Sequence, residues 1–455
     1  MLTSIENPER MNMIKNVFFI LKMSLILLLL SCSKTTDDNP SIKEPEQPEL
    51  VSDEYVLNNQ FEEFIDFTGN KGVWKVFGGG KDDTATAVYK ENSGYKGSNT
   101  IMLRADQKSD IAVSQYLAKE LEYRKLYRLS GRIKTESVQG DGGANLTIVG
   151  SWVRSDVVVG TSDWTYVSVD FFGPENGELA IGSRLGFWNA EATGIAYFDN
   201  IRVTEPEDVF VTKGEKIEAY IADELVYGTD QQMEAWLGRL DNFYTSYVEL
   251  LSGKIPYEGR TMLIQSNPRN FAWAWAGEYI YWNEDYVTNA LKLVVEEGDA
   301  CFGIVHEIGH NFAPGNWDDY NGSWIWDEEV MANFRMAYAL EDLNETVVMN
   351  EQKWVGADII NFYKIAYDNT ITIGQEANGD AIQYTLLRLV NEYGWEPIIN
   401  AFDELYAMNK GISIGNNKWE KFEFFLNTIS KYTPEDVKNT YTTDELTLIE
   451  SALNK

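Results

Sequence analysis

The spacing of apolar residues changes abruptly near residue 206, and this change limits the chain to folds built from two unlike parts. Before it, short stretches of alternating apolar and polar residues, such as 100–104, 127–134 and 164–171, are separated by Gly, Asn, Asp and Ser. This pattern predicts many short strands packed as an antiparallel sandwich or jelly roll. Beyond it, apolar residues recur at helical spacing. We therefore expect an all-β domain at 54–206 and a different domain at 207–455.

The second domain begins with a helical pattern that opens at Thr229 and Asp230. One face of this helix carries eight apolar residues: Met233, Trp236, Leu237, Leu240, Phe243, Tyr244, Tyr247 and Leu251. Residues 260–265 and 277–282 have the composition of strands, and helical patterns dominate from there to the end. This order predicts an α+β domain with a helical C-terminal lobe.

Charge and cysteine content exclude several classes of protein. The 455 residues carry a formal charge of -33, so the surface repels phosphate backbones and nucleic acid is not an expected partner. The two cysteines, Cys32 and Cys301, cannot form a disulfide framework. Cys301 has apolar neighbours and is expected to be a buried packing residue. Stability must therefore come from apolar cores and from bound metal.

The N-terminus carries an export pattern. Residues 14–31 form a basic start followed by a short apolar run, interrupted by Lys22, that ends at Cys32. The run is too short to be a convincing transmembrane helix. The ending Leu29-Leu-Ser-Cys32 resembles a bacterial lipobox, which implies that 1–31 is a signal peptide and that Cys32 is lipidated. Translation could start at Met11 or Met13.

An acidic stretch rich in Ser, Thr, Asp, Pro and Glu follows the cysteine, and we interpret 32–53 as a flexible tether. It resembles the surface-export signals of Bacteroidetes lipoproteins. The resemblance implies a protein attached to the outer membrane by its lipid anchor alone. It favours the cell surface and leaves the periplasmic face as the alternative.

The segment Phe302-Gly-Ile-Val-His-Glu-Ile-Gly-His-Asn311 contains the pattern His-Glu-x-x-His. On a helix, His306 and His310 share one face and can bind a single metal ion, with Glu307 beside them as the base that takes a proton from an activated water. Gly303 and Gly309 are poor helix formers, which indicates close packing around the helix.

The histidine count restricts the third ligand. These are the only two histidines of the chain, so a third protein ligand must be an acid. Glu329 follows His310 after 18 intervening residues and is the preferred candidate, with Glu328 and Asp327 as alternatives. Asn333, one helical turn further on, could orient Glu329.

These motifs resemble those of the enhancin-like gluzincin peptidases, including the mucin-degrading members. The resemblance rests on His306-Glu-Ile-Gly-His-Asn-Phe312, Glu329-Val-Met-Ala-Asn333 and Ala274-Trp-Ala-Gly-Glu-Tyr-Ile280, and 384–395 is similar to the helical lobe of that family. It implies a zincin fold, a zinc ion held by His306, His310 and Glu329, and a strand near 274–280 that aligns the substrate backbone.

The first domain resembles carbohydrate-binding modules of families four and nine. The similarity rests on Asn59-Gln-Phe-Glu62, Tyr95-Lys-Gly-Ser98, Tyr127-Arg-Leu-Ser-Gly131, Asp163-Trp-Thr165 and Tyr197-Phe-Asp-Asn-Ile201. It implies a structural calcium ion near Glu62 and Asp199. Trp152 and Trp188 could form a platform on which a sugar ring stacks, although core packing is the alternative for each.

The sequence thus predicts a surface zinc endopeptidase in which Glu307 activates the attacking water. Tyr384, Tyr363 and Tyr320 are candidates for stabilising the oxyanion, and the sequence does not choose among them. By resemblance, the substrates are host-type glycoproteins such as mucins, with glycans held by the sandwich. The alternative is a glycan-binding surface lipoprotein whose zincin domain is inactive or structural.

Overall fold

The computed structural model describes the chain over residues 54–67, 72–78, 85–267, 272–314, 324–373, 377–408, 414–415 and 417–454. The expected signal peptide, Cys32, the tether and Tyr320 lie outside these ranges. The chain from Ser52 to Lys455 forms one compact unit. No helix of the described ranges is both long and apolar enough to span a membrane.

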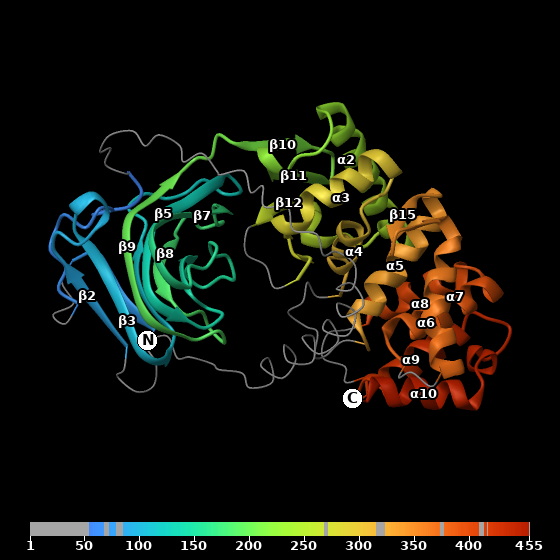
Figure 1. Cartoon of the computed structure of the whole chain (residues 1–455). Helices are drawn as coiled ribbons and strands as arrows, with labels where there is room; N and C mark the ends of the chain where they lie inside the picture. Colours follow the sequence, from blue (N-terminus) through green and yellow to red (C-terminus); the bar gives the residue numbers. More distant parts are fainter. Residues whose placement is uncertain are drawn as a thin grey trace. The chain divides into compact units, whose positions relative to one another are not determined.

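The first part of the described chain is an antiparallel sandwich of two sheets (Figure 1). One sheet has the strand order β1 (Lys75–Gly78), β4 (Ile111–Tyr116), β8 (Ala180–Leu185) and β6 (Ala144–Ile148). The other has the order β2 (Ala85–Lys90), β3 (Thr100–Ser109), β9 (Ala192–Thr204), β5 (Leu126–Gln139) and β7 (Gly160–Phe172). Apart from β2 and β3, neighbours in the two orders are non-consecutive in sequence, as in sandwiches of the jelly-roll type.

Alternation along the strands builds the core of the sandwich. Because successive strand residues point to opposite faces, every second side chain of a strand meets the other sheet. In β3, Ile101, Leu103 and Ala105 are buried in this way, in one core with Val113 of β4 and Ile181 of β8 from the other sheet. This β-sheet region therefore has a buried apolar core of its own.

The second part opens with a mixed five-stranded sheet. Its order is β10 (Val209–Lys213), β11 (Ile217–Ala222), β12 (Met262–Asn267), β14 (Tyr279–Asn283) and β13 (Ala274–Trp275). The pairs β11–β12 and β12–β14 are parallel, whereas β13 is an antiparallel edge strand. A two-stranded ribbon, β15 (Thr346–Met349) and β16 (Gln352–Val355), lies further along the chain.

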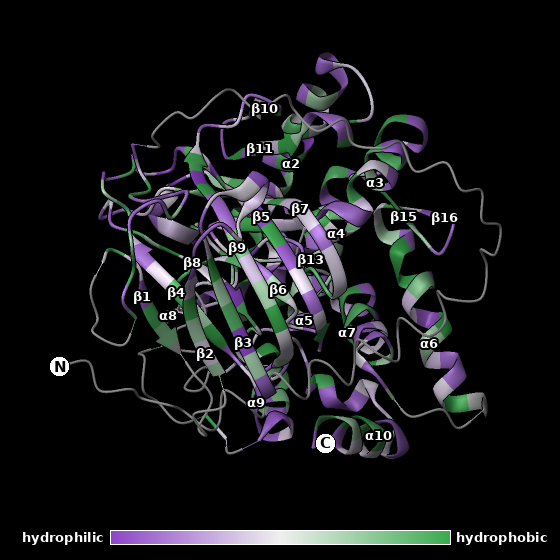
Figure 2. Ribbon diagram, turned by 60° about the vertical axis from the view of Figure 1, so that its left-hand side comes forward, coloured by the Kyte–Doolittle hydropathy of each residue, from purple (hydrophilic) through white to green (hydrophobic). Residues whose placement is uncertain are grey.

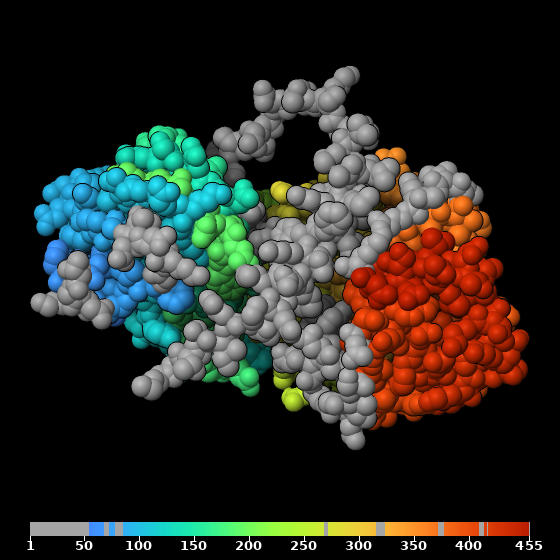
Figure 3. All heavy atoms as spheres, turned by 90° about the horizontal axis from the view of Figure 1, so that it is seen from below, coloured from blue at the N-terminus to red at the C-terminus, as the bar shows by residue number. Residues whose placement is uncertain are grey.

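Helices make up most of the remainder. They are α2 (Asp230–Leu250), α3 (Glu284–Glu297), α4 (Phe302–His310), α5 (Glu328–Leu343), α6 (Ile359–Ile373), α7 (Gly379–Tyr393), α8 (Glu396–Ala407), α9 (Lys418–Ser430) and α10 (Thr443–Leu453). In Figure 2 the ribbons of α6 and α10 carry both hydrophobic and hydrophilic segments, as amphipathic helices do. The orange and red atoms of the C-terminal helices form one continuous mass in Figure 3.

The helix predicted after Thr229 is present, and its start has a clear local cause. Thr229 accepts a hydrogen bond from the Gln232 backbone while Gln232 reaches back to the backbone of Thr229, which completes a capping box. The buried face of α2 contains seven of the eight apolar residues of the sequence pattern; Leu251, also buried, is the C-cap.

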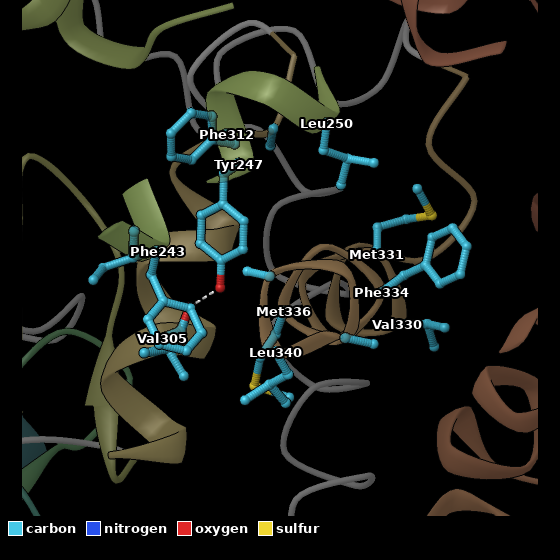
Figure 4. Close-up of a cluster of buried hydrophobic side chains, with 14 of the residues drawn as sticks. Phe243, Tyr247, Leu250, Val305, Phe312, Val330, Met331, Phe334, Met336 and Leu340 are labelled. Atoms are coloured by element: carbon cyan, nitrogen blue, oxygen red, sulfur yellow. Dashed lines mark hydrogen bonds between the residues drawn. The ribbon is translucent and has the colours of Figure 1, made fainter. Parts of the chain in front are cut away.

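Helices α2, α4 and α5 share the core that supports the candidate site (Figure 4). Tyr247 of α2 is fully buried, and its hydroxyl donates to the Val305 carbonyl of α4 at 2.8 Å. Phe312 packs edge-on against Tyr244 and Tyr247. The helix with the His-Glu-x-x-His pattern is therefore held by apolar packing and by a hydrogen bond from α2.

Candidate metal centre

Helix α4 is short, and glycines allow its neighbours to approach closely. A Cβ at Gly303 would lie 2.2 Å from the ring of Trp273, and one at Gly309 would lie 3.1 Å from the Ala332 carbonyl of α5. The close packing predicted from these two glycines is therefore present. Cys301 precedes the helix, is 1% exposed and has a free thiol, in agreement with the predicted packing role.

The structure brings His306, His310 and Glu329 together. The two Nε2 atoms lie 2.9 Å apart, and Oε2 of Glu329 lies 3.2 Å from His306 Nε2 and 3.4 Å from His310 Nε2. Ligands arranged tetrahedrally about zinc at about 2.0–2.1 Å are separated by about 3.3 Å. Within the described ranges this is the one group of three His, Cys, Asp or Glu donors that converges in this way.

The charges of the three side chains are coupled. Burial lowers the pKa of His310, but the carboxylates of Glu329 and Glu328 outweigh it and raise the pKa to about 10. Desolvation raises the pKa of Glu329, but His310 and His306 outweigh it and bring the pKa well below its usual range. When both Nε2 atoms carry no proton, all three atoms are acceptors, and a divalent cation between them would supply the positive charge that a proton supplies otherwise, so the residues fit a metal ion.

Each of the three acidic candidates for the third ligand has a different role in the structure. Asp327 is the N-cap of α5, accepting from the Val330 backbone at 3.3 Å, and pairs with Lys418 at 2.6 Å. Glu328 is buried and forms an ion pair with Arg335 at 2.5 Å. Only Glu329 reaches both imidazole Nε2 atoms.

Asn333 does not orient Glu329 as the sequence suggested. Its Oδ1 lies 2.8 Å from Nδ1 of His306, one helical turn from Glu329 on α5. With the proton on Nδ1 donated to this amide oxygen, Nε2 of His306 is left free to bind a metal. On the other imidazole, Nδ1 of His310 lies 3.6 Å from the Glu328 carboxylate.

Glu307 lies beside the three donors and is tied to the edge strand. Burial raises the pKa of Glu307, while the two imidazoles and a hydrogen bond from the Ala276 backbone act in the opposite direction. Ala276 directly follows β13, whose Trp275 side chain is 49% exposed. The strand expected near 274–280 is thus split into β13 and β14, and the turn between them contacts the predicted base.

Two contributors to the site were not identified from the sequence. Asn311, next to His310, donates through its Nδ2 to the Gly277 carbonyl at 2.8 Å and accepts from the Tyr257 hydroxyl at 2.8 Å. Asp380, in the first turn of α7, is within electrostatic range of His306, which lowers its burial-raised pKa. Neither has a distinctive motif, although Asn311 adjoins a predicted ligand.

Two of the three predicted oxyanion residues lie in the described ranges, and both contact other aromatic side chains. Tyr384 packs against Tyr367, with ring centroids 4.7 Å apart, and beneath the guanidinium of Arg388. Tyr363 is fully buried against Phe362, with ring centroids 5.2 Å apart. Tyr320 lies outside the described residues.

In the sandwich, Trp152 and Trp188 lie in contact, with ring centroids 4.0 Å apart and nearly perpendicular planes. Phe187 stacks on Trp188, and Trp152 is 39% exposed. These two tryptophans, which the sequence analysis considered as one platform, are 36 positions apart. The loops that follow β6 and β8 bring them into contact.

The residues predicted to hold calcium lie near each other but are differently engaged. Asp199 is buried and accepts hydrogen bonds from the Tyr95 backbone at 2.7 Å and the Ser98 hydroxyl at 2.5 Å. Burial raises its pKa to about 6. Glu62 is exposed and accepts from Asn99 at 3.4 Å. Calcium binding here stays a prediction.

Comparisons with known proteins find similarity in structure only. No family model matches the chain, and no curated protein matches it in sequence. It is similar to a functionally unknown conserved protein from Bacillus anthracis, at 12% identity and a TM-score of 0.41 over 80% of this chain and 76% of that one. It is also similar to a metallopeptidase from Bacteroides thetaiotaomicron, at 13% identity and a TM-score of 0.34 over 69% and 57%.

Another similar structure matches a smaller share of the chain. A xylan-binding domain from Paenibacillus barcinonensis matches 32% of this chain over 98% of its own length, at 12% identity and a TM-score of 0.22. Together, fold and site define a multidomain protein: a large β-sheet region, an α+β region with a helical C-terminus, and a His-His-Glu cluster with the donor set of a metal centre.

Proposed function

We propose that this protein is a zinc-dependent endopeptidase of the gluzincin type, similar to the enhancin-like peptidases. The observation that carries the proposal is the convergence of His306 Nε2, His310 Nε2 and Glu329 Oε2 at 2.9–3.4 Å, with Glu307 beside them. Two imidazoles and one carboxylate would be the three protein ligands of a catalytic zinc site, whereas structural sites have four protein ligands.

The side chains have separate tasks in this proposal. His306 is held in one tautomer by Asn333, and His310 is backed by Glu328 and Arg335. Zinc, when bound, supplies a Lewis acid that polarises the scissile carbonyl. Glu307 takes a proton from the attacking water and delivers it to the leaving amine. Burial raises the pKa of Glu307, which favours uptake of the proton from water.

The proposed substrates are glycoproteins of the host type, such as mucins. The resemblance of the motifs to mucin-degrading peptidases supports this choice, as does the sandwich that precedes the site. We further propose that Cys32 is lipidated and that the protein is anchored to the outer membrane, with its soluble part at the cell surface. The export pattern that ends at Cys32 supports this location.

A glycan-binding role of the sandwich is the second candidate function. It is favoured by the contact between Trp152 and Trp188 and by the partial exposure of Trp152. An exposed indole face packs well against the C–H face of a sugar ring. If the metal centre proved inactive, this role would remain as the main function.

The test is cleavage of mucin and of an unglycosylated protein, with Glu307→Gln as the diagnostic variant. We expect cleavage that stops with a chelator and returns with zinc. Glu307→Gln should keep one zinc ion per chain while the rate falls by about 100- to 10,000-fold. The matched control is Glu234→Gln, an exposed acid on α2.

Two results would contradict the proposal. One is a wild-type chain that binds glycan and zinc but releases no fragments from either substrate, which favours the glycan-binding alternative. The other is a Glu307→Gln variant that retains the wild-type rate.

A further inference from the structure

The sandwich packs against the second part of the chain, which begins at β10 and is here called the C-terminal lobe. The two share a small apolar interface, here called the apolar seam. Buried residues of both make up this seam: Leu126 and Phe172 from the sandwich, and Tyr220 and Leu263 from the lobe. Phe172 stacks on Tyr279 with ring centroids 5.0 Å apart and planes 14° apart. A seam of this kind holds two parts in one arrangement, whereas a flexible linker would leave them independent.

A cation of the sandwich lies at the edge of this seam. Arg124 forms a short ion pair with Glu278, and both side chains are about five-sixths buried, at 17% and 16% exposure. The same guanidinium donates to the Thr261 carbonyl at 2.7 Å and to its hydroxyl at 2.6 Å. Because several donors are engaged at once in a partly buried place, this contact fixes direction as well as charge.

The backbone at Arg124 is itself held in place by hydrogen bonds. Arg124 has φ of 62°, a conformation that non-glycine residues rarely adopt. Its N–H donates to the Gly173 carbonyl at 3.0 Å, and the Gly173 N–H donates to the Lys125 carbonyl at 2.9 Å. An unfavourable local conformation persists where surrounding contacts over-determine it, and such positions cluster at functional places.

Glu278 ends the segment that touches the predicted base. Residue 276 donates from its backbone to Glu307, and the carbonyl of Gly277 accepts from Asn311, the neighbour of His310. Residues 276, 277 and 278 are thus attached, in this order, to Glu307 of α4, to Asn311 at the C-cap of α4, and to Arg124 of the sandwich. The segment 274–278, here called the edge segment, is held from both sides.

We propose that Arg124 is a positioning residue that fixes the edge segment against α4, so that the sandwich is a working part of the peptidase site. The effect on catalysis rests on the peptidase function proposed above. The edge segment sets the distance between Glu307 and a substrate backbone that binds along the free edge of β13. A displacement of about 1 Å in this distance can cost about 100-fold in rate.

The test compares variants of the full chain. We expect Arg124→Ala to increase hydrogen exchange of the backbone in 274–283 and to lower kcat by about tenfold or more, with zinc content unchanged. Arg124→Lys, which keeps the charge but not the fork of donors, should recover part of the rate. Arg104→Ala is the control, because this arginine forms an exposed pair with Asp106 in the same sandwich.

Glu278→Gln provides a second route if Arg124→Ala fails to fold. It should reproduce the loss of rate and the faster exchange, and the double variant should be no worse than either single one, because the two residues act as a unit. Arg260→Ala removes the other cation on Glu278, which comes from the C-terminal lobe itself, and should have the smaller effect.

Failure of the inference and failure of the proposed function differ in outcome. Wild-type exchange in 274–283 and wild-type kcat in both Arg124→Ala and Glu278→Gln would overturn the positioning role. A general rise in exchange over the whole chain, with an unchanged kcat per folded molecule, would also overturn it. If the zinc-loaded wild type cleaves nothing, the peptidase proposal fails, while local exchange at 274–283 still decides whether Arg124 holds the segment.

Discussion

At the scale of single residues, Asn333 orients one imidazole of the candidate metal centre, a role that the His-Glu-x-x-His motif does not reveal. Its amide oxygen fixes the orientation and tautomer of His306 from one turn beyond Glu329. Polar partners of this kind support the basicity and direction of an imidazole ligand. The consequence is a testable link between an amide on α5 and metal binding by the imidazoles of α4.

We expect Asn333→Ala to weaken zinc binding by about 10- to 100-fold while leaving the fold intact. Competition with a chelator of known affinity measures the change. Asn333→Asp is the informative companion, because a carboxylate can still accept from His306. Equal zinc affinity in Asn333→Ala and wild type would show that the hydrogen bond does not support the ligand.

Trp275 is the second residue with a predicted effect. Its side chain is 49% exposed on β13, one position before the backbone group that contacts Glu307. Under the proposed function it lies beside the substrate near the scissile bond. Trp275→Ala should raise KM about tenfold, since truncation of a contacting tryptophan costs about 1–2 kcal/mol of binding.

Steady-state kinetics on a peptide substrate measure this change. Tyr116→Ala is the control, because it removes an exposed aromatic side chain that is distant from Trp275 in the sequence. An unchanged KM in Trp275→Ala would place the substrate elsewhere.

At the scale of elements, the contact between α4 and β13 depends on a missing side chain. Gly303 has no Cβ, and the ring of Trp273 occupies the space where one would be. Gly238 of α2 is the opposite case, because a Cβ there would meet nothing within 4 Å. Replacing each of these two helical glycines by alanine therefore separates the effect of packing on stability from the effect of helix propensity.

Gly303→Ala should lower the free energy of unfolding by about 1–3 kcal/mol through overpacking against Trp273, partly offset by better helix propensity. Gly238→Ala should raise it by up to about 1 kcal/mol. Denaturant unfolding of both variants gives the comparison. A stabilising Gly303→Ala would mean that Trp273 can move away at no cost.

At the scale of the whole molecule, an acid between the sandwich and the C-terminal lobe makes stability depend on pH. Burial raises the pKa of Glu284, at the start of α3, to about 8. Asp156 and Asp170 of the sandwich and Glu224 add to this shift, and Arg128 opposes it. The folded chain thus binds the proton of Glu284 more tightly than the unfolded chain does.

The sign of the effect follows from this difference in proton binding. The contribution of Glu284 is complete below its ordinary pKa near 4.5, and it is lost as pH rises toward 8. Glu284→Gln cannot ionise, so it should match wild type at pH 4.5 and exceed its free energy of unfolding by about 1–3 kcal/mol above pH 8.

Unfolding at several pH values measures the difference, and the exposed neighbour variant Asp285→Asn is the control. A gap between Glu284→Gln and wild type that does not widen with pH would remove Glu284 as the cause.

The sequence alone determined the features that depend on neighbours along the chain. The capping box at Thr229, the apolar face of α2 and the common face of His306 and His310 all follow from spacings of three or four residues. The alternation that predicts the sandwich has a period of two. Such patterns are visible in sequence because the groups that interact lie within a few residues of one another.

Only the tertiary structure decided which distant groups meet. It distinguished Glu329 from Asp327 and Glu328, because the first turn of α5 turns only one of the three carboxylates toward both imidazoles. It assigned Asn333 to His306 and connected Arg124 with Glu278 across 154 positions. These pairings depend on how helices and sheets pack, and packing is set by many weak contacts that no local spacing records.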